Sequence, residues 1–175
     1  MTIARKLALQ VLFALLGMGV MTAWFLVSER KLILEERQTG VRQVVEVAHG
    51  IAVHFHTLST KGAMPDEEAR QRAAAAMQAL RYSGNEYIWI NDMHPRMVMH
   101  PVRPELNGQD LSANKDPNGL PLFMEFVRIV KTQGAGFVPY MWPKAGSDIP
   151  VEKTSYVKGF EPWGWVIGSG VYIDT

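Results

Sequence analysis

The most continuous hydrophobic segment of the chain is Leu7–Val27, which contains no formal charge. A helix of about 20 residues spans about 30 Å, the thickness of the hydrocarbon core of a membrane. Arg5 and Lys6 precede the segment, and Trp24 lies where an interfacial aromatic residue is expected. A cleaved signal peptide has a shorter apolar stretch, followed by small residues at the cleavage site. The pattern therefore predicts a short tail at 1–6 and an uncleaved transmembrane helix at 7–27, with a buried core helix as the alternative.

The orientation of this helix does not follow from its flanking charges. Basic residues precede it, but Arg30, Lys31, Arg37 and Arg42 follow it and alternate with glutamates. A simple count of basic residues would place the far flank in the cytoplasm, but long carboxyl-terminal domains can translocate largely regardless of charge. Charge counting alone is therefore indecisive.

Residues 28–59 have the spacing of an amphipathic helix. Val41, Val45, Ala48, Ala52 and Phe55 recur in alternating steps of four and three residues. Three further apolar residues widen this stripe: Val44, Ile51 and Leu58. A stripe of that width can cover a sheet on one side and contact a partner helix on the other.

The remainder predicts an α+β domain at 28–175. Helical patterns recur at about 65–81 and 120–132, and β-rich runs occupy 86–92, 96–101, 136–142, 154–160 and 165–173. The polar loop at 102–119 is long, and such loops in compact domains are usually functional. Because strands and helices do not alternate regularly, we expect a mainly antiparallel sheet with helices on one side.

Composition narrows the possible functions. The formal net charge is +1, so nothing indicates a nucleic-acid partner, and no cysteine is present for a disulfide or a thiolate. None of the common catalytic or nucleotide-binding motifs occurs, so we expect neither an enzyme nor a bound cofactor. His49, His54 and His56 lack a suitably spaced carboxylate, so a metal or haem site there is only a minor alternative.

The candidate binding residues are concentrated around the predicted sheet. His100 ends the second β-rich run, at the mouth of the long loop. Tyr140 and Trp142 are two residues apart and share one face of the run 136–142. Tyr156 lies in the next run, and Lys153 directly precedes that run. Hydroxyl, indole and ammonium donors with few acids suit a small carboxylate, although aromatic side chains on strands are often simply core.

Several long motifs resemble the single Cache sensor domain of bacterial transmembrane receptors, above all of methyl-accepting chemotaxis proteins. They are YIWINDMHPRMVMHPVRPELNGQDLS, GAGFVPYMWPK and KTSYVKGFEPWGWVIGSGVYID. The resemblance covers about Ser28–Thr175 and implies a PAS-like, five-stranded antiparallel sheet with a long amino-terminal helix. It also implies a cytoplasmic amino terminus, a periplasmic domain anchored in the inner membrane, and a homodimer formed through the long helix. Members of this family commonly bind acetate, propionate, pyruvate or lactate.

The resulting hypothesis is a sensor domain that binds a small organic acid and passes a signal across the membrane. Tyr140, Lys153 and Tyr156 would hold the carboxylate with help from His100, and Trp89 and Trp142 would limit ligand size. Receptors of this kind normally continue into a second membrane helix, a HAMP linker and a signalling domain, so we expect a fragment or a truncated protein. Two alternatives stay open: a dimerisation module without ligand, and the front end of a histidine kinase or cyclic-dinucleotide enzyme.

Overall fold

The computed structural model describes residues 3–173, apart from the side chains of residues 8, 9, 11, 14, 30 and 31. The chain divides between Arg37 and Gln38 into two compact units. Helix α1 (Ile3–Thr60) begins in the first unit and ends in the second, which contains every other element.

The predicted transmembrane segment Leu7–Val27 is helical and forms part of α1. A search of the described residues finds no helix with both the length and the apolar character needed to cross a membrane. The transmembrane helix stays a prediction from the sequence. Four side chains of this segment, at residues 8, 9, 11 and 14, lie outside the described residues.

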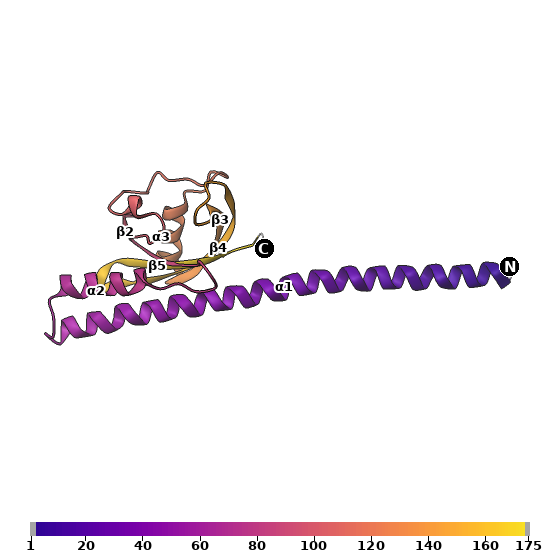
Figure 1. Ribbon diagram of the computed structural model, residues 1–175, viewed down its shortest axis with the longest axis horizontal. Coiled ribbons are helices and arrows are strands. Elements are labelled where there is room, and N and C mark those ends of the chain that lie inside the picture. The colour runs from indigo at the N-terminus through magenta and orange to yellow at the C-terminus, as the bar shows by residue number, and fades with distance from the viewer. Residues whose placement is uncertain (1–2, 174–175) are drawn as a thin grey trace. The chain divides into compact units, whose positions relative to one another are not determined.

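The second unit is built on one five-stranded antiparallel sheet, in the order β2-β1-β5-β4-β3 (Figure 1). The strands are β1 (Ile88–Asp92), β2 (Met97–Met99), β3 (Ala135–Pro143), β4 (Pro150–Phe160) and β5 (Trp165–Tyr172). Every neighbouring pair is antiparallel. The predicted α+β class and the five strands are confirmed.

One face of the sheet is covered by the carboxyl-terminal part of α1 and by α2 (Asp66–Gln78). The buried side chains of α1 are those of the predicted stripe, Val41, Val45, Ala48 and Ala52. In α2 the small Ala69 and Ala73 are buried, which allows that helix to lie close to its neighbours. These helices and the facing strand residues form a first core.

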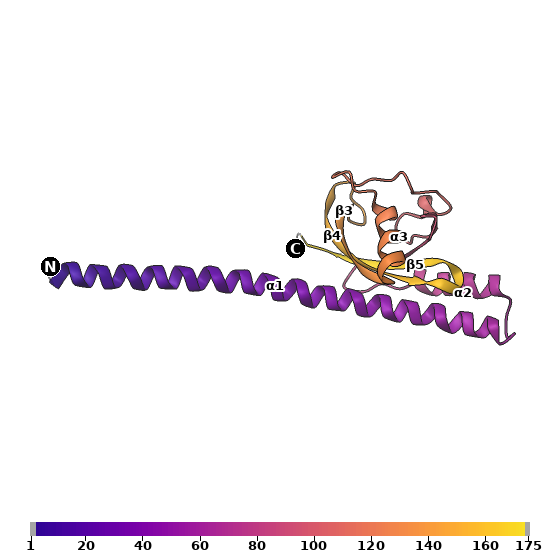
Figure 2. The same ribbon diagram turned by 180° about the vertical axis from the view of Figure 1, so that it is seen from behind.

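Helix α3 (Leu122–Gln133) covers the opposite face, as both views show (Figures 1 and 2). The expectation that all helices lie on one side is therefore wrong. The physical reason is that the central strands are apolar on both faces: β5 is buried along nearly its whole length. A sheet of that kind needs a cover on each side, and α3 has a separate apolar face for the second one.

The turns and the long loop are held by aspartates. Asp92 accepts from the backbone N–H groups of His94 and Arg96, at 2.8 and 2.9 Å. Asp116 accepts from Asn118 and Leu120 within the loop, and from Met141 in β3 at 3.0 Å. Asp110 accepts from Ser112. Through these contacts the three aspartates stabilise the turns and the long loop.

Candidate functional site

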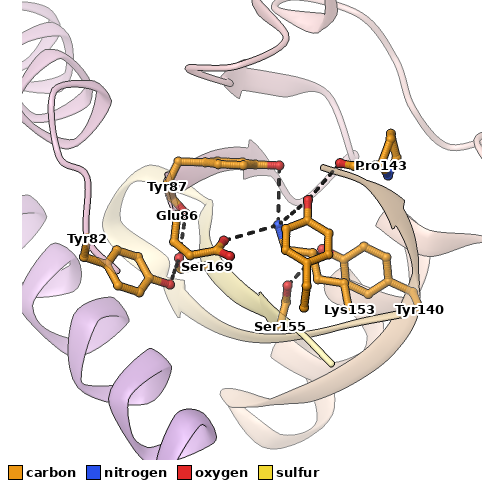
Figure 3. A network of polar contacts seen from close by, with 9 residues as sticks. Tyr82, Glu86, Tyr87, Tyr140, Pro143, Lys153, Ser155 and Ser169 are labelled. Carbon is orange, nitrogen blue, oxygen red and sulfur yellow. Dashed lines mark hydrogen bonds and ion pairs between the residues drawn. The ribbon is translucent and has the colours of Figure 1, made fainter. Parts of the chain in front are cut away.

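The α3 face of the sheet contains a buried ammonium group. Lys153, on β4, has only 1% of its side chain exposed. Its Nζ lies 4.5 Å from the ring centroids of Tyr87 and Tyr172 and 3.4 Å from both hydroxyl oxygens. The Oε2 atom of Glu86 is 4.0 Å away (Figure 3). The lysine is thus held between two aromatic rings, with one carboxylate beside it.

Burial shifts the pKa values of both Lys153 and Glu86. Desolvation lowers the pKa of Lys153 to about 8, and the nearby Glu86 carboxylate acts in the opposite direction. Burial also raises the pKa of Glu86, against the effect of Lys153 and Lys144. Lys153 therefore remains mostly protonated at neutral pH, in surroundings where a cation attracts an anion strongly.

The hydroxyl groups around Lys153 are oriented by neighbouring polar atoms. Tyr140, which pairs with Lys153 across β3 and β4, has its hydroxyl 2.8 Å from Ser155 Oγ (Figure 3). Tyr172 donates to the carbonyl oxygen of Pro143 at 2.8 Å. Both tyrosines thus occupy fixed positions on the same face as the lysine.

A cavity of about 290 Å³ lies beside this cluster. Its walls come from the segment after β2, the end of β3 and the connection between β3 and β4; they are Tyr87, Val102, Arg103, Trp142, Pro143, Lys144, Gly146, Ser147 and Asp148. A second hollow of about 10 Å³, near the volume needed for one water molecule, lies toward α3. Tyr87 and Trp142 line both spaces, so the two spaces adjoin.

His100 is a neutral hydrogen-bonding group in the wall of the smaller hollow. Its Nδ1 accepts from the backbone N–H groups of Val102 and Arg103, at 3.3 and 2.9 Å. Burial, followed by the charges of Lys153 and Arg103, lowers its pKa to about 3. Because Nδ1 acts as an acceptor, the hydrogen of the neutral ring is on Nε2, which is thus a donor.

Five of the six predicted site residues meet on the α3 face. Trp89, His100, Tyr140 and Trp142 line the smaller hollow, and Lys153 lies against Tyr87. Trp89 is also a core residue, because its ring packs 5.4 Å from Phe126 and it donates to Asn91 at 3.2 Å.

Tyr156 is on the other face, so its predicted place beside Lys153 is wrong. Its ring lies 4.8 Å from Phe137 and 5.9 Å from the guanidinium carbon of Arg42, within the core under α1. Successive side chains of a strand point to opposite faces, and positions 153 and 156 are an odd number apart. Alternation alone therefore excludes Tyr156 from the lysine's side of β4.

Sequence reasoning missed Tyr87, Tyr172, Glu86 and Arg103. Tyr87 could have been found by alternation, because it lies two residues before Trp89. Tyr172 reaches the site because β5 pairs it directly with Lys153, a register that only the folded sheet defines.

The histidines considered for a metal site pack against aromatic rings. His49 and His56 lie edge-on to Phe160, at 5.4 and 5.7 Å between ring centroids. His54 contacts Phe55, its neighbour in α1.

The antiparallel sheet, the long amino-terminal helix and the cavity beside the loops define a PAS-like sensor fold. The chain belongs to the Cache domain family, whose model matches residues 21–175. It is 42% identical over 174 residues to the methyl-accepting chemotaxis protein McpP of Pseudomonas putida, covering 99% of this chain and 32% of that protein. It is 30% identical over 120 residues to the sensor histidine kinase MctS of Rhizobium johnstonii, covering 69% of this chain and 26% of that protein. The chain thus spans about a third or less of the length of these relatives.

Solved structures agree with this assignment. A periplasmic sensor domain of a chemotaxis protein is 55% identical, with a TM-score of 0.80, covering 81% of this chain and 98% of that one. A Cache chemosensory domain described for its recognition of carboxylic acids is 48% identical, with a TM-score of 0.79, covering 82% of this chain and 98% of that one. The chain is therefore a Cache sensor domain related to those of chemotaxis receptors.

Proposed function

We propose that this domain binds a small monocarboxylate at Lys153 and is the sensing part of a chemotaxis receptor. The observation that carries the proposal is the buried Lys153 ammonium, held between Tyr87 and Tyr172 next to a cavity. A desolvated cation among oriented hydroxyl groups is a strong carboxylate partner, because hydrogen bonds with charged groups strengthen away from water.

The size of the site suits a small acid. The cavity volume of about 290 Å³ is at the lower end of the range for ligand pockets. Trp142 and Tyr87 supply apolar walls, and Trp89 is packed behind them against Phe126. The likeness to a Cache domain that recognises carboxylic acids supports the same class of ligand here. Acetate, propionate, pyruvate and lactate are therefore the ligands to test.

The proposed signal is a change in the sheet on which α1 packs. Ligand on the α3 face would draw the segment around Arg103 and the connection around Asp148 toward Lys153. Residues of β4 pack on α1 from the opposite face, through Tyr156 and Phe160. Movement of β4 would therefore alter the packing of α1, in the manner of two alternative arrangements of packed elements.

Calorimetric titration of the purified 175-residue chain with the four acids tests the binding site. We expect Lys153→Met and Tyr140→Phe to weaken binding by about tenfold or more, since each removes a hydrogen bond to a charged ligand. Lys158→Met and Tyr156→Phe are matched controls from the other face of β4 and should leave the dissociation constant unchanged.

Two results would contradict this site. One is the absence of binding by any of the four acids to the natively folded chain. The other is equal affinity of wild type and Lys153→Met, once circular dichroism has shown that the variant is folded.

We further propose that residues 7–27 anchor the domain in the inner membrane, with the sensor on the periplasmic side and a homodimer formed through α1. The uncharged Leu7–Val27 segment and the chemoreceptor relative support this arrangement. The expressed chain should stay in the membrane pellet after an alkaline wash, whereas a variant lacking residues 7–27 should be released. Because the chain has no cysteine, Ser147→Cys should react with a membrane-impermeant maleimide in cells with a permeabilised outer membrane. Release of the full chain, or labelling only after lysis, would contradict the proposal.

The chemotaxis output is preferred over a kinase output because of the greater likeness to the chemoreceptor, at 42% identity over 174 residues against 30% over 120.

A further inference from the structure

Glu86, two residues before β1, has an unusual environment for a carboxylate. Its Oε2 atom is buried and has no hydrogen-bond partner among the described residues. The nearest charge is the Lys153 ammonium, 4.0 Å from that oxygen, and the carboxylate points toward it in Figure 3. Glu86 retains 15% exposure of its side chain, so a proton from solvent can reach it.

The charged and titratable groups around Glu86 come from four segments. One of them is β3, where Tyr140 interacts with the Glu86 charge and stays neutral because burial raises its pKa well above the ordinary value. Lys153 faces it from β4, and Lys144 acts on it from the connection after β3. Tyr82 and Tyr87, on either side of Glu86 in sequence, also interact with its charge. Both tyrosines are neutral at physiological pH, since burial raises the pKa of Tyr87 to about 12 and that of Tyr82 further. Glu86 is thus the carboxylate that balances the buried lysine.

A ligand carboxylate at Lys153 would place two negative groups beside one buried ammonium. Like charges that share a site raise the pKa of one of them strongly, and burial has already raised the pKa of Glu86. In the proposed site, hydrogen bonds would hold the ligand carboxylate in its ionised form, whereas Glu86 Oε2 has no hydrogen bond to lose. Glu86, rather than the ligand, would then accept the proton.

We propose that Glu86 is the resident counter-ion of Lys153 and that a ligand carboxylate replaces it, with uptake of one proton by Glu86. This inference rests on the proposed function. The proton comes from solvent or from a buffer acid; one O–H bond forms on Glu86, and no covalent bond of the ligand changes. The domain then senses acid concentration and pH together. Where Glu86 is ionised in the free protein and protonated in the complex, affinity rises by up to about tenfold for each unit that the pH falls.

Calorimetry at about pH 6, in MES and in Bis-Tris buffer, measures the number of protons that the protein takes up when it binds the ligand. These buffers differ in protonation enthalpy, so the difference in observed binding enthalpy gives the number of protons taken up. At this pH Lys153, with a pKa of about 8, is already charged and contributes little uptake. The probe is whichever of acetate, propionate, pyruvate and lactate binds most tightly to the wild-type chain.

The informative variant is Glu86→Gln, which keeps the shape of the side chain and removes its charge. Its matched control is Glu152→Gln, the same change at the exposed residue next to Lys153 on β4. Wild type and Glu152→Gln should take up the same number of protons on binding, up to one, and Glu86→Gln close to none.

The outcomes separate the two proposals. Binding of a probe without proton uptake by wild type overturns the role of Glu86 and leaves the carboxylate site intact. The same is true if Glu86→Gln takes up as many protons as wild type. Binding of no probe overturns both proposals. If Glu86→Gln does not fold, the number of protons that wild type takes up on binding still tests the role proposed for Glu86.

Discussion

At the scale of single residues, the site depends on how burial acts on cationic groups. Lys153 and His100 are both almost completely buried, and desolvation lowers the pKa of each. The lysine starts from an ordinary value of 10.5 and so keeps its charge at neutral pH, whereas the histidine starts from 6.5 and loses it. The same environment thus produces one cation and one neutral donor.

His100 makes the stability of the domain pH-dependent. The unfolded chain binds a proton at this histidine below about pH 6.5, but the folded chain does so only near pH 3. The free energy of unfolding therefore falls as the pH falls through this window. We expect wild type to lose about 2 kcal/mol more than His100→Asn between pH 7 and pH 5, from about 1.4 kcal/mol per pH unit.

Urea unfolding of both proteins at the two pH values measures this difference. The Asn variant is suitable because its amide oxygen can accept the backbone N–H groups that Nδ1 accepts in wild type. Identical pH dependence of the two proteins would show that His100 does not titrate in this way.

At the scale of elements, the position of the site depends on a close contact between the neighbouring strands β1 and β5. Gly168 pairs with Trp89, and a Cβ atom there would lie 2.3 Å from Trp89 Cζ2. The indole can therefore lie flat on β5 only because residue 168 has no side chain. Trp89 then supports Phe126 and Tyr140 in the wall of the smaller hollow.

Gly168→Ala should consequently displace the Trp89 ring and lower the free energy of unfolding by about 1–3 kcal/mol, the usual cost of overpacking a core. The matched control is Gly50→Ala in α1, where an added Cβ meets no atom within 4 Å. That change should raise stability by up to about 1 kcal/mol, because alanine favours the helix more than glycine does. Chemical denaturation measures both, and unchanged stability of Gly168→Ala would contradict the packing described.

At the scale of the whole molecule, the sheet of the second unit packs against different elements on its two faces. The α3 face contains the cavity and the buried lysine, and the α1 face contains the helical packing through which a signal would leave. Strand β4 contributes to both faces of the sheet, because Lys153 points to one face and Tyr156 to the other. In the proposed function, ligand binding and signal output would thus be separated by the thickness of one sheet.

The proposed homodimer can be tested on the exposed edge of the α1 stripe. Val47 is 64% exposed and lies one helical turn from the half-buried Val44 and Ile51. If α1 forms the dimer, Val47→Glu should place a charge in the interface and shift the chain toward monomer in sedimentation velocity. Ile149→Glu, at a residue 72% exposed between β3 and β4, is the control and should leave the association unchanged. Equal association of wild type and Val47→Glu would exclude this surface.

The sequence by itself determined the elements of this domain and most of the residues of its site. Periodicity located the stripe of α1, the five strands and α3, because the spacing of apolar residues follows the geometry of each element. The alternation of side chains along a strand also predicts that Tyr156 and Lys153 lie on opposite faces.

Only the tertiary structure decided which face of the sheet each helix covers and which strands are neighbours. Those choices depend on contacts between distant segments, such as Tyr172 of β5 beside Lys153 of β4 and Glu86 before β1. The sequence proposes Lys153 as a binding residue, but its altered pKa and its counter-ion come from that arrangement.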